Sequence, residues 1–297
     1  MNKLFSIYNL SEFKDSGLYS IGHKNQLRTD KRLFRRKYVK SFTFSAVTKG
    51  VEYYLVDENY KEVHAGEILI IPPNIEYESF YPYQTPSECY FWRLDVTHKE
   101  LFGLSEKNTK TLIDNLFNIN ENIIPSSSTC IKLCKKLFDL ISSNPNPNDA
   151  VSNLKINSLL ISIHTEILFP DMPQKSIDDF ELINKITSYL NENLENDINL
   201  RSLSDIFALS YSNLNEKFRK YTGFPIGAYL HELRIHRAAQ MLLEGKSVSE
   251  CAATFGYCSS DYFSRVFKKI LDIPPSKYAS FMADKFQREE KIWIYEY

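Results

Sequence analysis

The sequence predicts an α+β protein with two domains: a β-rich N-terminal domain with appended helices, and an all-α C-terminal domain. Three observations support this fold class. Short strand-like runs punctuated by Gly and Pro extend to Val96, and helical periodicity begins at Thr97. Between Leu200 and Tyr278 the chain repeats one helical unit. A length of 297 residues with 43% apolar content is sufficient for two hydrophobic cores.

Residues 1–96 are predicted to form a small β-barrel or sandwich. Ser41–Val47 alternates in polarity, and Val51–Val56 is rich in β-branched and aromatic residues. Glu67–Ile71 is a short apolar run that ends at a Pro-Pro pair, and Tyr90–Leu94 is a further apolar run. Short strands with this punctuation are typical of closed or two-layered antiparallel sheets.

Residues 97–170 have helical periodicity and predict helices appended to the sheet. The last of them, Leu154–Phe169, is apolar around much of its circumference, which implies burial on more than one side. A homodimer seam along this helix is one hypothesis, and packing within the domain is the alternative. Residues 171–180 are predicted to be a linker, and residues 181–285 the C-terminal domain.

The C-terminal domain contains a predicted helix-turn-helix unit twice. At an offset of 49 residues the copies carry matching apolar pairs, Leu214 with Phe218 and Phe263 with Phe267. Each pair is spaced i to i+4 and therefore lies on one helix face. In this motif the second helix enters the DNA major groove. The candidate N-caps of the second helices are Ser210 and Ser259.

A connecting helix is predicted over Ile226–Leu243, with a length of about 27 Å. A rigid connector of this size can place two recognition helices near the roughly 34 Å repeat of successive major grooves. His231 and His236 superficially resemble a zinc-binding HExxH motif, but at i to i+5 they lie about 140° apart around the helix. No nucleotide-binding or nucleophile motif occurs, so we predict no enzyme, metal or cofactor.

Residues throughout both copies match a family pattern. This stretch of roughly 100 residues resembles the AraC/XylS family of transcription regulators. The resemblance implies a tandem helix-turn-helix domain that binds promoter DNA, with activation favoured over repression. The sequence departs from the family at Asp272, where Gly is usual, and at Glu216, where Arg is common. The matching residues include Ser210, Leu214, Phe218, Arg219, Lys220, Gly223, Phe224, Tyr229, Arg234, Gly256, Tyr257, Tyr262, Phe263, Arg265, Phe267, Lys268, Lys269, Pro275 and Tyr278.

Basic side chains cluster on the two second helices, although the net charge of the chain is −1. Between residues 201 and 280 there are eleven Lys and Arg against seven Asp and Glu. Such side chains can contact DNA phosphates, and a solvated helix face is the alternative. The phosphate-contact candidates are Lys217, Arg219, Lys220, Arg265, Lys268 and Lys269.

The exposed positions of the second helices are candidates for base contacts. Arg265 can hydrogen-bond guanine bidentately, and Asn215 can pair with adenine. Glu216 would repel phosphate and can instead accept from cytosine or orient Arg219, so we expect the first copy to bind more weakly. The predicted DNA-binding residues are Ser212, Asn213, Asn215, Glu216, Arg219, Lys220, Ser260, Asp261, Ser264, Arg265, Lys268 and Lys269.

The N-terminal domain carries a second resemblance. The segment Ala65–Pro73 and the run Tyr90–Leu94 are similar to the cupin-type sensing domain of many AraC/XylS regulators. This similarity implies a small-molecule effector, and the abundant aromatic residues suit a sugar or another small polar molecule. His23 and His64 are isolated in the sequence, so we predict no metal site in this domain. The candidate effector-binding residues are Tyr54, Glu76, Trp92 and Arg93.

Cysteine usage and hydropathy favour a cytoplasmic protein. Five Cys without a CxxC motif argue against a secreted disulfide framework. No apolar run reaches the roughly 20 residues of a membrane span, and the N-terminus lacks a signal-peptide core. The expected partners are double-stranded promoter DNA, a small-molecule effector and a second copy of the chain, with RNA polymerase as a further candidate. The alternative function is a ligand-independent promoter-binding protein whose barrel serves only dimerisation.

Overall fold

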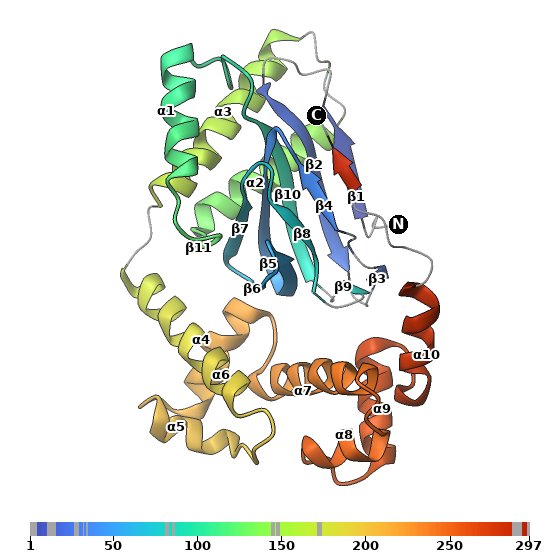
Figure 1. Cartoon of the computed structure of the whole chain (residues 1–297). Coiled ribbons are helices and arrows are strands. Elements are labelled where there is room, and N and C mark those ends of the chain that lie inside the picture. Colours follow the sequence, from blue (N-terminus) through green and yellow to red (C-terminus); the bar gives the residue numbers. More distant parts are fainter. Residues whose placement is uncertain are drawn as a thin grey trace.

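The computed structural model shows two lobes, a folded β-sheet with three helices along one side and a C-terminal lobe of helices (Figure 1). It describes residues 5–10, 16–26, 30–31, 33, 35–80, 83–84, 87–143, 146, 149–170, 174–286 and 293–295. The predicted α+β class and the order of the β-rich and all-α regions are confirmed.

The N-terminal lobe is built on one sheet with the strand order β1-β2-β10-β5-β8-β4-β12. Strands β6 and β7 pair with β5, and β11 pairs with β7, so the sheet folds over an apolar interior. Strand β11 lies in the segment that was predicted to be helical only. The strands are β1 (Phe5–Asn9), β2 (Leu18–Gln26), β3 (Asp30–Lys31), β4 (Arg36–Tyr38), β5 (Ser41–Val56), β6 (Asn59–His64), β7 (Glu67–Ile71), β8 (Glu76–Ser79), β9 (Tyr83–Gln84), β10 (Ser87–Asp95), β11 (Ile123–Pro125) and β12 (Trp293–Tyr295).

Strand β5, at 16 residues, runs through both parts of the sheet. Its first half pairs with β10 and β7, and its second half pairs with β6 and β8. Between the halves, Gly50 has a φ of 77°, which glycine adopts at little cost. Among the described strands, β5 alone contributes to all three buried apolar clusters.

Three helices cover the outer face of β2 and β10: α1 (Glu106–Phe117), α2 (Ser128–Ser142) and α3 (Ala150–Leu168). Helix α3 buries Ile156, Leu160 and Ile163 in this layer, so packing within the domain accounts for one of its apolar faces. Val151 and Leu154 on α3 are 57% and 69% exposed.

The C-terminal lobe has a single core that includes the matched apolar pairs of both helix-turn-helix copies. Its first helix begins at Gln174, so the prediction of a linker over residues 171–180 is wrong from residue 174 onwards. The rest of the predicted linker lies outside the described residues. The elements are α4 (Gln174–Glu192), η2 (Leu200–Ser202), α5 (Leu203–Ile206), α6 (Tyr211–Thr222), α7 (Ile226–Leu243), α8 (Val248–Thr254), α9 (Ser260–Leu271) and α10 (Pro275–Phe286).

Candidate nucleic-acid interface and interior cavity

Both helix-turn-helix copies turn through a residue with left-handed backbone. In the first copy this residue is Ala208, with a φ of 51°, and in the second it is Gly256, with a φ of 68°. A left-handed conformation costs an L-residue roughly 1–2 kcal/mol but costs glycine little. Ser210 and Ser259 follow, and each side chain accepts a hydrogen bond from the backbone N–H three residues on. The two predicted N-caps are therefore confirmed.

The second helices also end in the same geometry. Gly223 ends α6 with a φ of 80°, and Asp272 ends α9 with a φ of 60°. The second copy has an additional stabilising feature at the start of α8. There the Ser247 and Glu250 side chains accept hydrogen bonds from each other's backbone N–H groups in a capping box.

Helices α6 and α9 lie toward opposite ends of α7 (Figure 1) and present matching outer faces. Their inner faces are fully buried through the apolar pairs that the 49-residue offset aligned. Tyr262 was not among the predicted residues, although its ring centroid lies 5.8 Å from the guanidinium carbon of Arg265. The matched exposed side chains are Ser212, Asn213, Glu216, Arg219 and Lys220 on α6, and Asp261, Tyr262, Arg265, Lys268 and Lys269 on α9.

Asn215 and Lys217 make contacts within the protein that the sequence did not predict. The Oδ1 atom of Asn215 accepts a hydrogen bond from the Ile226 backbone N–H at 2.9 Å, so this amide caps α7 and its acceptor is already engaged. This contact engages one acceptor position of the amide, and the pairing of Asn215 with adenine stays a prediction. Lys217 forms an ion pair with Asp179 of α4, so its charge is neutralised inside the domain. On α9, Ser260 and Ser264 are half-buried on the flanks of the outer face.

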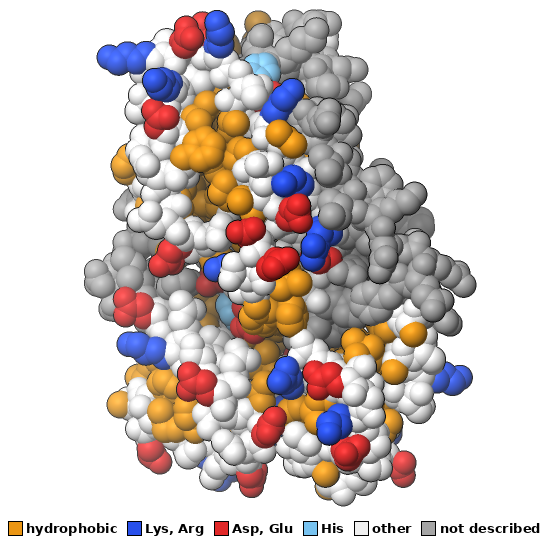
Figure 2. Space-filling model, in the orientation of Figure 1, with side chains coloured by type: hydrophobic (Ala, Val, Ile, Leu, Met, Phe, Trp, Pro, Cys, Tyr) orange, Lys and Arg blue, Asp and Glu red, His pale blue; other side chains and the backbone are white. Residues whose placement is uncertain are grey.

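The charge of the two outer faces differs at two matched positions, Ser212 with Asp261 and Glu216 with Arg265, and the second difference is the larger. Glu216 of α6 corresponds to Arg265 of α9, so the outer face of α9 is the more positive of the two. The space-filling view shows acidic and basic side chains interspersed over the visible face of the C-terminal lobe (Figure 2). Any contact with phosphate must therefore come from the few basic side chains on the outer faces of α6 and α9 rather than from a general positive field.

A cavity of about 100 Å³ lies inside the folded sheet. Its apolar walls come from β7 and β10, including Leu69, Ile71 and Phe91. Its polar lining comes mainly from β2, β5 and β10. The polar groups are Lys24, Arg36, Thr43, Ser45, Glu52, Tyr54 and Cys89.

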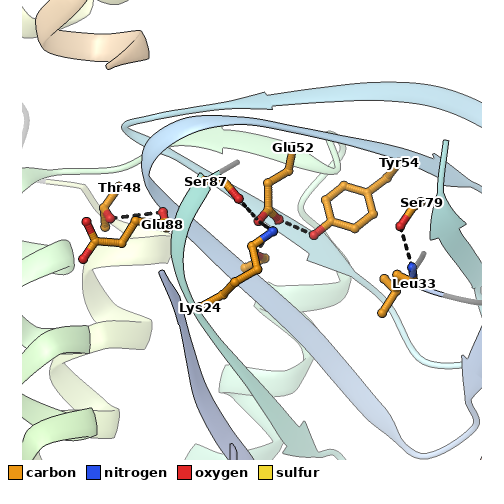
Figure 3. A network of polar contacts seen from close by, with 9 residues as sticks. Lys24, Leu33, Thr48, Glu52, Tyr54, Ser79, Ser87 and Glu88 are labelled. Carbon is orange, nitrogen blue, oxygen red and sulfur yellow. Dashed lines mark hydrogen bonds and ion pairs between the residues drawn. The ribbon is translucent and has the colours of Figure 1, made fainter. Parts of the chain in front are cut away.

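Glu52 is the centre of a buried polar network in this cavity (Figure 3). One carboxylate oxygen lies 2.5 Å from Lys24 Nζ and accepts from Ser87 Oγ at 2.9 Å, and the other accepts from the Tyr54 hydroxyl. Although burial alone raises the pKa of Glu52, the Lys24 ammonium and the hydroxyl donors outweigh burial and hold that pKa below its usual value. Removing one charge of a buried ion pair is strongly unfavourable.

Of the four predicted effector-binding residues, the structure places Tyr54 on the cavity and the other three elsewhere. Trp92 faces the helical layer, where its ring stacks on Phe44 at 5.0 Å. The Arg93 guanidinium lies 4.3 Å from the ring centroid of Tyr38. Glu76 is partly exposed and pairs with Lys37 at 3.5 Å. These three residues do not line this cavity, and their part in effector binding stays a prediction.

Lys24 and Glu52 were missed, although one signal was present in the sequence. Residues two apart on a strand share a face, so the selection of Tyr54 should have included Glu52. Lys24 carried no such signal, because the region before residue 41 was not assigned to strands.

His231 and His236 have separate partners on α7. His231 Nδ1 lies 3.2 Å from the Tyr257 hydroxyl, and His236 Nε2 lies 3.5 Å from Glu232. Within the described ranges, no group of three or more His, Cys, Asp and Glu side chains is placed to hold a metal ion. None of the described helices is both long and apolar enough to cross a membrane.

A family model described as "Helix-turn-helix domain" matches residues 203–280. The chain is 31% identical over 97 residues to the multiple antibiotic resistance protein MarA of Escherichia coli, which covers 32% of this chain and 76% of MarA. It is 32% identical over 107 residues to the HTH-type transcriptional activator RhaR of Mannheimia succiniciproducens, which covers 36% of this chain and 39% of RhaR.

The chain spans a third to a half of the length of several of the curated relatives that it matches. Among solved structures, ToxT of Vibrio cholerae aligns with 94% of this chain and 98% of its own, at 14% identity and a TM-score of 0.33. That score is too low for the likeness to bear on the cavity or on the arrangement of the two lobes. The family model places its match within the C-terminal lobe, at residues 203–280.

Proposed function

Because the chain belongs to the AraC/XylS family of helix-turn-helix transcription regulators, we propose that it binds double-stranded promoter DNA through the outer faces of α6 and α9. The observation that carries this proposal is that α6 and α9 present matching exposed faces. Each helix begins at a capping serine, and the two helices lie toward opposite ends of α7. Helix α7, at 18 residues, separates them by a length comparable to the roughly 34 Å groove repeat. A protein that binds promoters acts in the cytoplasm with the DNA.

The test is selection of genomic fragments by the purified full-length protein, followed by sequencing of the bound DNA. We expect recovery of a shared site with two recognition segments about one helical turn apart. Retention of fragments without a common sequence, at an affinity equal to that of random DNA, would contradict sequence-specific binding. Arg265→Ala protein provides the matched control, because it removes one outer-face side chain without disturbing a buried group.

Activation of transcription is the direction we propose. The relative RhaR is a transcriptional activator by name, and the similarity covers 36% of this chain and 39% of RhaR. Transcription in vitro from a recovered promoter, with RNA polymerase and increasing protein, measures the sign directly. We expect transcript levels to rise, and a fall would make the protein a repressor that uses the same DNA interface.

A small-molecule effector bound in the interior cavity is the second part of the proposal. The supporting observation is the buried Lys24–Glu52 pair with its hydroxyl partners, since such networks are retained where polar groups must be positioned. A polyhydroxylated ligand such as a sugar can exchange hydrogen bonds with all of these groups. Thermal-shift measurements with a panel of sugars test this, because a ligand specific to the folded state raises the melting temperature.

The competing function, a promoter-binding protein whose sheet domain serves only dimerisation, has one supporting observation. Val151 and Leu154 are exposed on α3, and apolar side chains gather over the helical layer in the space-filling view (Figure 2). Light scattering of wild-type and Leu154→Glu protein at micromolar concentration tests the dimer. A dimer that persists in Leu154→Glu, or a wild-type monomer, would remove this seam from consideration.

A further inference from the structure

We propose that strand β5 transmits ligand binding in the interior cavity to the DNA-binding lobe, because residues Val51 to Tyr54 contact both. The inference rests on the proposed effector cavity and adds the route by which that cavity regulates DNA binding. Along this segment the side chains alternate between faces. Glu52 and Tyr54 line the cavity, whereas Val51 and Tyr53 belong to the core of the C-terminal lobe.

On the cavity side, a ligand cannot enter without moving the network around Glu52. Ligand pockets usually enclose roughly 300–1,000 Å³, and this cavity has about 100 Å³. The Lys24 and Ser87 contacts close it from β2 and β10, and the Tyr54 contact closes it from β5 itself. A ligand that replaces these contacts must therefore displace side chains of β5.

On the opposite face, β5 is part of the interface with α6 and α7. Tyr53 is 6% exposed, and its ring centroid lies 5.5 Å from that of His236 on α7. Gly223, at the end of α6, approaches the strand so closely that a Cβ there would lie 3.1 Å from the Gly50 backbone nitrogen. The end of the first recognition helix thus rests on β5 directly.

The adjoining hairpin strand extends this interface. Within β6, His64 lies with its ring centroid 6.0 Å from that of Tyr229 on α7. Asn191 Nδ2 of α4 donates to Glu62 Oε2 at 3.4 Å. Both β6 residues are fixed to β5 by the antiparallel register that runs from Val51 to Val56. A shift of the second half of β5 about Gly50 would therefore carry the whole hairpin against α4, α6 and α7.

The first experiment changes a β5 side chain that contacts the DNA-binding lobe and measures how accessible the cavity becomes. Neither DNA nor effector is present. Cys89 lines the cavity and is 2% exposed, and burial raises the pKa of its thiol, so alkylation requires the cavity to open. In full-length Tyr53→Leu protein we expect iodoacetamide to label Cys89 about tenfold faster than in wild type, within the usual range of intersite coupling. Peptide mass spectrometry follows each cysteine separately.

Two controls distinguish transmission from general destabilisation. Phe267→Leu weakens the same core at α9, away from β5, and is expected to leave the labelling rate of Cys89 unchanged. Cys130 and Cys134 in the helical layer are buried thiols of the same chain and are expected to keep their rates in Tyr53→Leu. Equal acceleration at all buried cysteines, or no acceleration at Cys89, would overturn the proposal.

The second experiment runs in the opposite direction. In Glu52→Gln protein we expect hydrogen exchange in the α7 peptide Tyr229–His236 to accelerate by about tenfold. Asp95→Asn, which removes a buried carboxylate at the far end of β10, is the matched control and is expected to leave that peptide unchanged. Unchanged exchange in Glu52→Gln would contradict transmission along β5.

Because Glu52→Gln removes the carboxylate that pairs with Lys24, the double variant Lys24→Met with Glu52→Gln provides a second arm in which neither side chain of the pair is charged. It is expected to show the same acceleration in α7, and unchanged exchange there would also contradict the proposal. Neither experiment contains DNA or effector. Failure of the coupling can therefore be distinguished from failure of DNA binding or of ligand binding.

Discussion

The two helix-turn-helix copies share a plan but differ in what surrounds them. The first copy turns through a left-handed Ala208, and its recognition helix contacts the sheet domain at Gly223 and α4 through Lys217. The second turns through Gly256, and its first helix begins with a capping box. We infer that the second copy is the stronger and more independent DNA contact, and that the first copy is the one that the sheet domain can regulate.

The largest expected effect tests whether the copies belong to one cooperative core. Phe218→Ala and Phe267→Ala should each destabilise the protein by about 3–5 kcal/mol, because both rings are fully buried at matched positions. Urea denaturation followed by circular dichroism measures this, with the 39% exposed Tyr262→Ala as a mild control. A much smaller loss for Phe218→Ala would show that the first copy unfolds separately from the second.

The next effect tests the inferred difference in DNA affinity. Arg265→Ala should weaken binding by about 1–3 kcal/mol and relax the sequence preference. The matched variant Glu216→Ala removes a negative charge and should strengthen binding slightly, and the gain should fade as salt increases. Fluorescence anisotropy at several salt concentrations measures both. Equal losses for the two variants would mean that the copies contact DNA alike.

A smaller effect concerns Asn215, which caps α7 instead of facing outwards. Asn215→Ala should cost about 1 kcal/mol of folding stability through the lost cap and leave the preferred DNA sequence unchanged. Ser264, at the matched position of α9, is the control, and Ser264→Ala should cost less. A change of sequence preference in Asn215→Ala protein, measured by repeating the genomic selection, would restore the role in base contact that the sequence suggested.

The smallest effects come from the left-handed positions. Ala208→Gly and Asp272→Gly should each stabilise the protein by about 0.5–1 kcal/mol, because glycine removes the side-chain strain at positive φ. The reverse change, Gly256→Ala, should destabilise it by a similar amount. Thermal melts of the three variants measure these stability changes. A loss of stability in Ala208→Gly would mean that the packing of the Ala208 methyl group stabilises the protein by more than the backbone strain destabilises it.

Local patterns predicted the DNA-binding lobe well because its signals are short in range. The serines at 210 and 259, the glycine at 223 and the matched apolar pairs act within a few residues of their own helices. The hydrogen bond of Asn215 was not predicted, because its partner is a backbone N–H eleven residues further on, across a turn. Exposure on a helical wheel does not reveal such a contact.

The sheet domain was harder to predict because β5 and β10 are buried on both faces. Trp92 and Cys89 are both apolar positions of β10, but one faces the helices and the other faces the cavity. Alternation separates the two faces without saying which of them encloses the cavity. The Lys24–Glu52 pair joins strands 28 positions apart in the sequence, and only the fold brings them together.

The two-sided burial of β5 also constrains how such a protein can be recombined. A hybrid that joins this DNA-binding lobe to a different sensing domain would lack Val51 and Tyr53, and a hydrophobic hollow between α6 and α7 would open to water. Successful chimaeras should therefore keep Val51 and Tyr53 together with the helices of the C-terminal lobe. Only Glu52 and Tyr54, which line the proposed ligand cavity, should be exchanged. Melting curves of paired chimaeras with and without Val51 and Tyr53 would show how much these two side chains stabilise the core of the C-terminal lobe.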